Sequence, residues 1–530
     1  MKKILLFISL LSTSCGFSLD NSLIKNKSLE GNPVSINSGL KPSPKEFGGN
    51  HGLKIRGILN TNKINNQNTS IDNIAIIRTS DIEKIKKNYN INILDKLTIN
   101  SQNIYKISLF DNKPFNVTKD ISTESKKKIE QISKDPSTLN IGIEKVMLNE
   151  SAEDMVDLYD NSGNIVKYPV PNSSQNSWWL NETSGTNIIK SWEYSQAENI
   201  NIAVFDRSFG KLDKYEDFKG RVNIHPEYMS NCRDTVPLDD PVCSSYMESP
   251  KHGFWVSSLI ASNGYKTNIL GVAPKSRITP IAIFSSWDFL KKLSIIKDYR
   301  DPINKKPIDI VNISSGLVIN RSDYKGKDCI KVLHGGMDIC DPELVMAQQL
   351  INDLSNNHKV IIVASAGNEG INTSSGDTSK FHFPSGLTNV IGVGAYEMSE
   401  INKGYIKRAD LYPKSTQVRN IIQSSSYGSS IDIWSAGDNI PIFYPKDIND
   451  TSRQWVEVKG TSFATPIVTG SVALLKSLKR DLNVRQIAYL LYESGIEIKD
   501  PSFKVDINNK QKALNSLESI KLLKTFIDKK

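Results

Sequence analysis

Long apolar runs are missing from this sequence, and so is any concentrated basic tract. No stretch approaches the roughly 20 apolar residues that a membrane-spanning helix needs. The 66 Lys and Arg exceed the 57 Asp and Glu only slightly and are spread along the chain, so we expect no nucleic-acid partner. Cysteines are also few, at 5 in 530 residues. The overall composition, with 38% hydrophobic and 23% charged residues, is typical of globular proteins. The length suggests about two to four folding units.

The N-terminus carries the pattern of an export signal. Two lysines precede the short apolar run Ile4–Leu11, which is followed by small residues, and this order is typical of a secretory signal peptide over residues 1–14. Leu11–Cys15 also resembles the bacterial lipobox, in which signal cleavage leaves a lipid-bearing cysteine. We therefore expect an exported protein, located at the cell envelope as a lipid-anchored precursor, outside the cell, or both. The alternative is an ordinary signal peptide with an incidental Cys15.

The other four cysteines fall into two equally spaced local pairs. Export supplies an oxidising compartment, in which such pairs close surface loops. We predict two disulfides, Cys232 with Cys243 and Cys329 with Cys340. A zinc site is the competing interpretation, but neither pair has the close Cys-x2-Cys spacing of zinc ligands.

The region before the C-terminal two thirds of the chain divides by composition. Residues 15–70 are rich in Asn, Ser, Gly and Lys and predict a flexible tether. Residues 71–150 alternate between strand and helix patterns and predict a small α+β domain. The segments expected there are strands at 74–77, 104–109 and 141–148 and helices at 81–88 and 126–133. Residues 151–177 are polar with two prolines, as in an exposed, cleavable linker.

Three short motifs in residues 178–530 carry residues suited to nucleophilic catalysis. The apolar run Asn201–Phe205 predicts a buried parallel strand that delivers Asp206 at its carboxyl end, where active groups gather in open α/β sheets. His252 begins an apolar stretch that suits a buried helix. Ser462 lies in Gly-Thr-Ser-Phe-Ala-Thr-Pro, where Pro466 requires a position near the first turn of a helix. Each residue alone would be structural more often than catalytic.

Together these motifs resemble the subtilisin-like serine proteases, or subtilases, over about Trp178 to Ala513. The serine motif is highly specific, and the order Asp, His, Ser along the chain is the order in that family. Further landmarks are Gly271–Pro274, Val311–Gly316 and Ala364–Gly370. The resemblance implies an α/β fold with a three-layer domain and a mostly parallel sheet. It implies catalytic roles for Asp206, His252 and Ser462, an oxyanion-binding Asn368, and substrate-binding residues Ser314, Ser315, Gly316, Ser365, Ala366 and Gly367.

The family also gives the N-terminal domain a meaning. Subtilases are commonly made with a βαββαβ, ferredoxin-like propeptide that assists folding and inhibits the active site until it is cleaved, and residues 71–150 resemble one. The alternative is an unrelated, permanent domain. The implied function is a secreted serine endopeptidase acting on polypeptides through an acyl-enzyme. The competing function is a catalytically impaired subtilase fold that serves as an envelope-attached binding or scaffold protein.

The sequence departs from the family pattern at several places. Asp206 is followed by Arg-Ser-Phe-Gly instead of Thr-Gly or Ser-Gly, and Phe254 stands where a threonine is usual. The loop Asn263–Asn268, where many subtilases bind calcium, offers Tyr265 and Lys266, so we predict no calcium there and no cofactor. Calcium elsewhere is left open. The two cysteine loops and residues 285–307 are insertions that we expect to rim the substrate groove.

Overall fold

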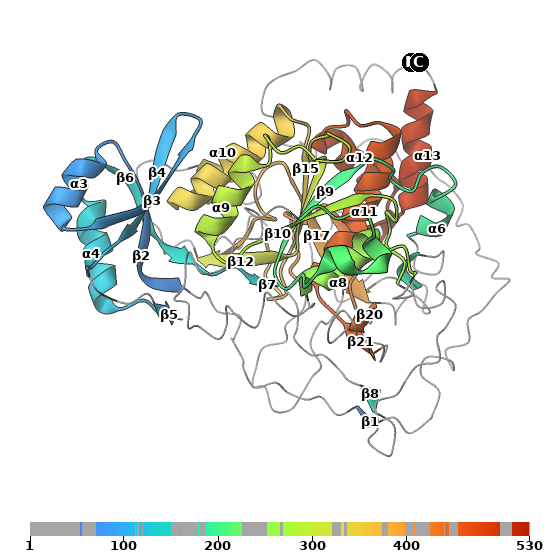
Figure 1. Cartoon of the computed structure of the whole chain (residues 1–530), viewed down its shortest axis with the longest axis horizontal. Helices are drawn as coiled ribbons and strands as arrows, with labels where there is room; N and C mark the ends of the chain where they lie inside the picture. The colour runs from blue at the N-terminus through green and yellow to red at the C-terminus, as the bar shows by residue number, and fades with distance from the viewer. Residues whose placement is uncertain are drawn as a thin grey trace. The chain divides into compact units, whose positions relative to one another are not determined.

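The computed structural model describes two main parts of the chain, shown in Figure 1. The described ranges are 70–149, 186–224, 252–320, 337–373, 380–397, 425–444, 454–498 and 511–528, with short gaps inside some of them, and the short elements β1, β8, η2, β13 and β18. The expected signal peptide, Cys15, Cys232, Cys243 and Cys329, and almost all of the expected tether and linker lie outside these residues. Two-residue strands β1 (Lys54–Ile55) and β8 (Leu158–Tyr159) pair antiparallel.

Residues 70–149 form an α+β domain around an antiparallel sheet. Its elements follow the order β2 (Ser70–Thr79), α3 (Ile82–Tyr89), β3 (Asn92–Ile99), β4 (Gln102–Ser108), β5 (Asn116–Thr118), α4 (Thr123–Ser133) and β6 (Thr138–Lys145). The sheet order is β3-β4-β2-β5, with β6 also paired to the central β2. Asp81 and Ser122 cap the two helices by accepting a backbone N–H with their side chains. Apart from the short β5, the order is β-α-β-β-α-β.

The larger part is built on a nine-stranded, mostly parallel sheet. The strand order is β10-β9-β11-β15-β17-β19-β23-β22, with β18 paired to β17. Only the pairings of β22 and β18 are antiparallel. The α/β prediction with a mostly parallel sheet is therefore confirmed. The strands are β9 (Asn201–Asp206), β10 (Arg277–Ala282), β11 (Ile310–Ile313), β15 (Ile361–Ser365), β17 (Val390–Glu397), β18 (Lys407–Arg408), β19 (Ile433–Ala436), β22 (Ile496–Glu497) and β23 (Lys512–Ala513).

Alternation along the strands separates two hydrophobic cores, one on each face of the sheet. In β9, Ile202 and Val204 join one core, whereas Ala203 and Phe205 join the other, because successive side chains of a strand point to opposite faces. The first core is covered by α6 (Ile188–Ser191), α8 (His252–Ala261), α11 (Thr461–Leu478), α12 (Val484–Ser494) and α13 (Ser516–Ile527). The second is covered by α9 (Ser286–Ile295) and α10 (Pro342–Asn356) (Figure 1).

The second core continues into the α+β domain. Ile76, Ile99 and Ile104 of its sheet belong to the same buried cluster as the apolar side chains of α9 and α10. The sheet of the N-terminal domain thus packs on these two helices, and the burial of shared apolar surface holds the parts together.

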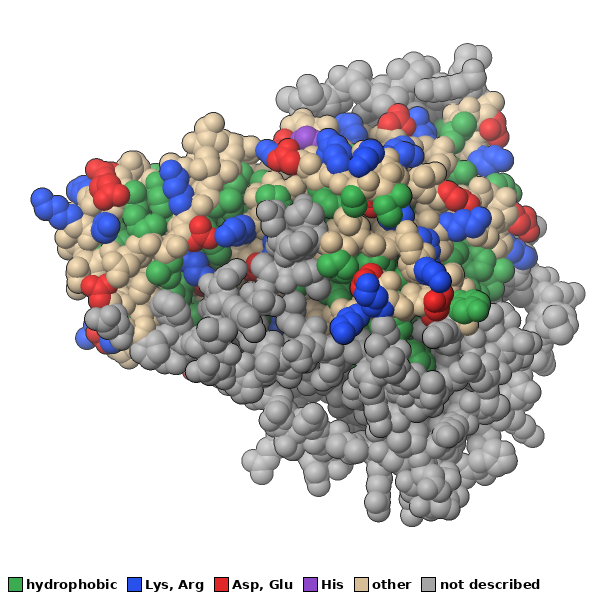
Figure 2. Space-filling model, viewed as in Figure 1, with side chains coloured by type: hydrophobic (Ala, Val, Ile, Leu, Met, Phe, Trp, Pro, Cys, Tyr) green, Lys and Arg blue, Asp and Glu red, His purple; other side chains and the backbone are tan. Residues whose placement is uncertain are grey.

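Smaller pairings complete the described architecture. β12 (Ser315–Asn320) lies between β16 (Lys380–Phe383) and β7 (Leu148–Asn149), antiparallel to both. β20 (Ile440–Tyr444) pairs with β21 (Gln454–Val458), and β13 (Ile330–Val332) with β14 (Met337–Ile339). In the part of the chain that the structure describes, no helix is both long and apolar enough to cross a membrane. Acidic and basic side chains are interspersed on the face drawn in Figure 2.

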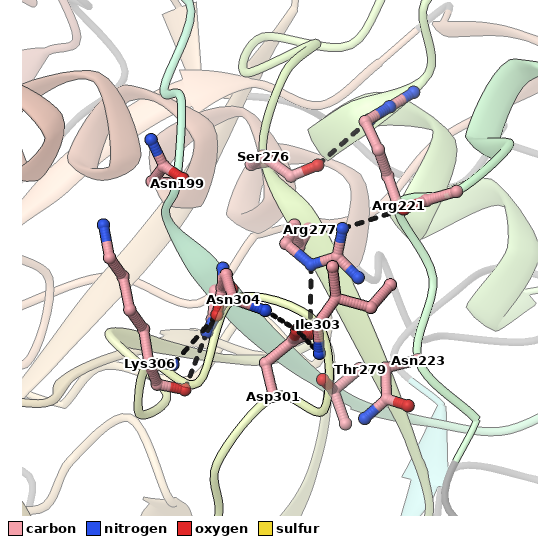
Figure 3. A network of polar contacts seen from close by, with 12 residues as sticks. Asn199, Arg221, Asn223, Ser276, Arg277, Thr279, Asp301, Ile303, Asn304 and Lys306 are labelled. Atoms are coloured by element: carbon pink, nitrogen blue, oxygen red, sulfur yellow. Dashed lines mark hydrogen bonds and ion pairs between the residues drawn. The ribbon is translucent and has the colours of Figure 1, made fainter.

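A polar network holds the end of the 285–307 insertion at the amino ends of the strands (Figure 3). Asp301 accepts hydrogen bonds from Arg277 Nε at 3.0 Å and from the backbone N–H of Ile303 at 2.8 Å. Asn201, the first residue of β9, donates to the Lys306 carbonyl at 3.0 Å. Asp206 ends β9 at the opposite edge of the sheet. The expectation that this whole insertion rims the substrate groove is therefore wrong for residues 301–307, because buried polar groups tie them to the other edge.

Candidate active site

Asp206 is the last residue of β9, at the carboxyl edge of the sheet, and it is fully buried. Its Oδ1 accepts the backbone N–H of Arg207 at 2.7 Å. The chain then turns through Ser208 and Gly210, both with positive φ. This turn stops the strand and fixes the carboxylate in place.

His252 is the first residue of α8 and is 4% exposed. Its Nδ1 lies 2.8 Å from Asp206 Oδ1 and 3.0 Å from Oδ2. The close approach depends on Gly253, which donates its N–H to the Arg207 carbonyl at 2.7 Å; a Cβ at this position would lie 2.4 Å from that oxygen. A glycine after the histidine therefore lets the helix start directly against the aspartate turn.

Ser462 is the second residue of α11, a helix that Gly460 caps with φ of 148°. L-residues with a side chain rarely adopt this φ, which explains the glycine. Pro466 lies inside the helix and lacks the N–H that would otherwise bond to the carbonyl of Ser462. The serine thus lies in the first turn, where the helix has unsatisfied backbone N–H groups.

His252 and Ser462 are brought together by the packing of α8 against α11. The imidazole ring lies 5.3 Å, centroid to centroid, from the ring of Phe463, the residue after the serine. His252 Nε2 and Ser462 Oγ are both buried, and neither has a hydrogen-bond partner among the described residues. Buried polar groups are normally satisfied, so two such groups on facing elements indicate a functional site.

Asn368 follows β15 after Gly367, whose φ is 93°. Its Oδ1 accepts hydrogen bonds from both the backbone N–H and the Oγ1 of Thr461, each at 3.0 Å. Thr461, the residue before Ser462, thus fixes the carboxamide oxygen of Asn368. Because the carboxamide is planar, this also fixes the direction of its other end, the hydrogen-bond donor Nδ2, beside the first turn of α11.

A family model of the subtilase family, peptidase S8, matches residues 197–513, which is more than half of the chain. The chain belongs to the subtilase family. This subtilase is a subtilisin-like serine protease. It is 25% identical to subtilisin of Bacillus pumilus over 279 residues, which make up 53% of this chain and 77% of that protein. It is also 25% identical to the major intracellular serine protease of Bacillus subtilis over 239 residues, covering 45% of this chain and 58% of that protein.

Solved structures resemble the fold of this subtilase. Fervidolysin from Fervidobacterium pennivorans, a keratinolytic enzyme related to subtilisin, is 18% identical with a TM-score of 0.55; the match covers 86% of this chain and 61% of that one. The epidermin leader peptide processing serine protease of Staphylococcus aureus is 17% identical with a TM-score of 0.54, covering 86% and 98%. At these identities the likeness concerns the fold.

The expected substrate-binding residues of the subtilase lie at the same edge of the sheet. Ser314 follows β11, and Ser315 and Gly316 begin β12. Ser365 ends β15, and the backbone N–H of Ala366 donates to the Val393 carbonyl at 3.0 Å. The Gly367 carbonyl accepts the N–H of Ser426 at 2.9 Å. The structure thus gathers the residues of both expected segments beside Asp206 and Asn368.

Two residues that departed from the family pattern take structural positions. Phe254 is fully buried against the rings of Tyr215 and Phe218, with centroid distances of 4.7 and 6.1 Å. The guanidinium of Arg207 lies 5.1 Å from the ring centre of Phe284. Neither substitution removes the contact between His252 and Asp206.

Sequence reasoning missed two residues that hold the site in position. Thr461 orients Asn368, and its place directly before the serine could have suggested such a role. Thr469 Oγ1, two turns further along α11, donates to Asn312 Oδ1 at 2.8 Å, and Asn312 Nδ2 donates to Ser314 Oγ at 3.0 Å. The hydrogen bond between Thr469 and Asn312 joins α11 to β11, and no local sequence pattern predicts it.

The remaining expected sites of the subtilase are described only in part. No group of three or more His, Cys, Asp or Glu side chains among the described residues is arranged to hold a metal ion. In the loop Asn263–Asn268, where we expect no calcium, residues 266–268 lie outside the described part of the chain. Cys340 is disulfide-bonded, but its expected partner Cys329 is not described, and the pairing stays a prediction.

Proposed function

We propose that this subtilase is an exported endopeptidase that hydrolyses polypeptides through Asp206, His252 and Ser462. The observation that carries the proposal is the bonded pair Asp206–His252, together with the buried His252 Nε2 and Ser462 Oγ, neither of which has a partner in the described part of the chain. A serine hydroxyl is a weak nucleophile near neutral pH and needs an adjacent base. The imidazole is the base that the site offers.

The reaction then follows from the roles of these groups. Ser462 Oγ attacks the scissile carbonyl carbon while its proton passes to His252 Nε2. Asp206 keeps Nδ1 protonated and stabilises the imidazolium without taking the proton. The tetrahedral intermediate collapses as the imidazolium protonates the leaving amine, which leaves an acyl-enzyme on Ser462. Water, deprotonated by the same imidazole, then releases the acid and restores the serine.

The negative charge of the tetrahedral oxygen requires fixed donors. Asn368 Nδ2 and the backbone N–H of Ser462 are the groups that we assign to it. The orientation of Asn368 by Thr461 supports this role, because donors held in place before the reaction cost no reorganisation during it. The strand segment Ser314–Gly316 and the segment Ser365–Gly367 would align an extended substrate next to these groups.

We also propose that residues 71–150 act as a propeptide and intramolecular inhibitor. Two observations support this: the domain packs on α9 and α10, and its last strand β7 pairs with Ser315 and Gly316 of β12. A strand lying on these two residues would block an extended substrate from the same place. Release would require cleavage between this domain and residue 178, in the expected linker 151–177.

Export, lipid attachment at Cys15 and the boundaries of the tether and linker rest on the sequence patterns. They are testable by fractionation: the Ser462→Ala precursor should be found with membranes, and its Cys15→Ser version should not. A Ser462→Ala precursor that is fully soluble with Cys15 intact would refute the lipid anchor.

The central test is labelling by a fluorophosphonate probe and hydrolysis of a peptide substrate. Ser462→Ala should abolish both, and Ser294→Ala, a partly exposed serine on α9, should change neither. Activity retained in Ser462→Ala would refute the triad. Folded, processed wild-type protein that resists the probe would instead favour an envelope-attached binding protein.

A further inference from the structure

The residue after the proposed catalytic aspartate departs from the family pattern, and its side chain reaches well beyond the aspartate turn. Arg207 stands where a small Thr or Ser is usual. Its backbone closes the turn: the N–H donates to Asp206 Oδ1 at 2.7 Å, and the carbonyl accepts the Gly253 N–H at 2.7 Å. Neither bond uses the side chain, so the aspartate turn does not explain why this residue carries a guanidinium.

The Arg207 guanidinium lies beside a carbonyl that also binds the end of the N-terminal domain. Its Nη2 donates to the Phe284 carbonyl at 3.5 Å, and its central carbon lies 5.1 Å from the centre of the Phe284 ring. The Met147 N–H donates to the same carbonyl at 2.9 Å. Arg207 is only 8% exposed. The guanidinium and the backbone of residue 147 therefore meet at one oxygen atom, in a place largely shielded from water.

The backbone of residues 146–149 marks the place that an extended substrate would take. β9 lies between β10 and β11 in the sheet and stops at Asp206. Beyond that point, residues 146–149 bond on one side to 284–285, which follow β10, and on the other side to 315–316, which follow β11. The Arg207 side chain starts where β9 stops and reaches the carbonyl of residue 284. It therefore runs alongside the chain that occupies this place.

A guanidinium at this place favours one kind of substrate side chain. Arginine stays protonated in proteins, and its planar fork of N–H donors matches the two oxygens of a carboxylate. Charges also interact far more strongly where water is excluded than they do in solvent. A substrate carboxylate beside Arg207 would therefore be stabilised, whereas a substrate ammonium group would lose water next to a like charge.

We propose that Arg207 determines specificity, and that this subtilase prefers polypeptides with an Asp or Glu side chain at one of the two positions that take the places of Leu148 and Asn149. The inference rests on the proposed function and names its class of substrate. These two positions lie between the one opposite Phe284 and the end of β9 at Asp206, so the arginine side chain passes them. Arg207 takes no part in proton transfer. The threonine or serine that is usual at this position offers no such charge.

The test begins with a cut that the enzyme itself chooses. Processed wild-type enzyme digests a library of peptides from a denatured proteome, and mass spectrometry locates the cuts. One cleaved peptide is then resynthesised with Glu, its uncharged counterpart Gln, or Lys at each of the four positions before the cut. We expect kcat/KM to be about tenfold higher or more for Glu than for Gln at one position or at two adjacent ones, with Lys the poorest there. Equal values for Glu and Gln at all four positions, or the same preference at every position, overturn the proposal.

Variants then assign the preference to the charge of Arg207. Arg207→Gln should bring the ratio of kcat/KM between the Glu and Gln peptides to within about twofold, and Arg207→Glu should turn the preference toward Lys. The matched control Arg300→Gln removes the same charge from an exposed residue next to the 301–307 loop, and it should leave the ratio unchanged.

Fluorophosphonate labelling of Ser462 shows whether a variant keeps a working triad. An unchanged ratio in labelled Arg207→Gln overturns the proposal. If a variant does not fold, the comparison of the Glu and Gln peptides with the wild-type enzyme decides, because equal values there overturn the proposal without any substitution. Wild type that resists the probe and cuts no peptide would instead defeat the proposed function, and this inference with it.

Discussion

Lys145→Met is predicted to loosen the N-terminal domain from the catalytic part by breaking a buried ion pair. Lys145 Nζ lies 2.8 Å from Asp341 Oδ2, and the two side chains are only 5% and 1% exposed. Removing one partner of such a pair leaves a buried charge and costs about 3–5 kcal/mol. Asp341 also caps α10 by accepting the N–H of Glu343 and Leu344 at 2.9 and 3.2 Å. These bonds continue to stabilise the carboxylate, so we expect the lower half of that range.

The assay is urea unfolding of the full-length chain in a Ser462→Ala background, in which we expect no self-cleavage. Native-state hydrogen exchange in β6 and α10 would show whether the domain detaches before the rest unfolds. The matched control is Lys145→Met with Asp341→Asn, because asparagine also caps helices and the double variant removes both charges of the pair. It should recover most of the loss. A cost below about 1 kcal/mol for the single variant, or a double variant no better than the single one, would refute the reasoning.

The remaining predictions concern a buried acid, the proposed oxyanion donor, the start of α8 and the cysteines. Burial, with Asp341 nearby, raises the pKa of Glu343 well above its ordinary 4.5. Because the folded chain holds this proton more tightly than the unfolded chain, protonated Glu343 stabilises the fold fully below pH 4.5, and this stabilisation is lost as the pH rises through the folded-state pKa. Glu343→Gln should remove this pH dependence from the free energy of unfolding, and an unchanged pH dependence would contradict the prediction. Asn368→Leu should lower kcat by about 10²–10³-fold with little change in KM, a magnitude measured in subtilisin and not in this chain, and a change confined to KM would speak against the oxyanion role. Gly253→Ala should weaken hydrolysis while the chain stays folded, because the added Cβ would displace α8 from the Arg207 carbonyl; full activity would show that the contact is dispensable. Nonreducing peptide mapping should join Cys232 to Cys243 and Cys329 to Cys340, and free thiols would exclude it.

The fold of the catalytic part was predictable where hydrophobic pattern and motif agree. The apolar run ending at Asp206 is a strand buried on both faces, and such strands read as continuous apolar sequence. β3 of the N-terminal domain was not predicted. Four of its eight residues, Asn92, Asp95, Lys96 and Thr98, are polar, and all positions before Ile99 are exposed or only partly buried. This edge strand therefore has no clear apolar face in the sequence.

The charged contacts between the two parts were beyond the reach of sequence reasoning. Lys145 is 196 positions from Asp341, and Glu144, paired with Lys106 at 2.8 Å, accepts from Ser285 across 141 positions. Each residue lies in a locally ordinary segment, and only the packing of the sheet on α9 and α10 brings them together. For the same reason, the 301–307 loop could not be assigned to an edge of the sheet before its polar partners were known.

The departures from the family pattern leave the contact between His252 and Asp206 intact because backbone constraints, more than neighbouring side chains, hold it. The side chain of Phe254 is fully buried in the core. The guanidinium of Arg207 contacts the ring of Phe284, while the Arg207 backbone carbonyl accepts the Gly253 N–H. The contact therefore needs a glycine at 253 but tolerates a large side chain at 254. The same holds at Gly460, whose φ of 148° begins the serine helix. Side chains around the site can thus change while the positions of the imidazole and the hydroxyl are kept.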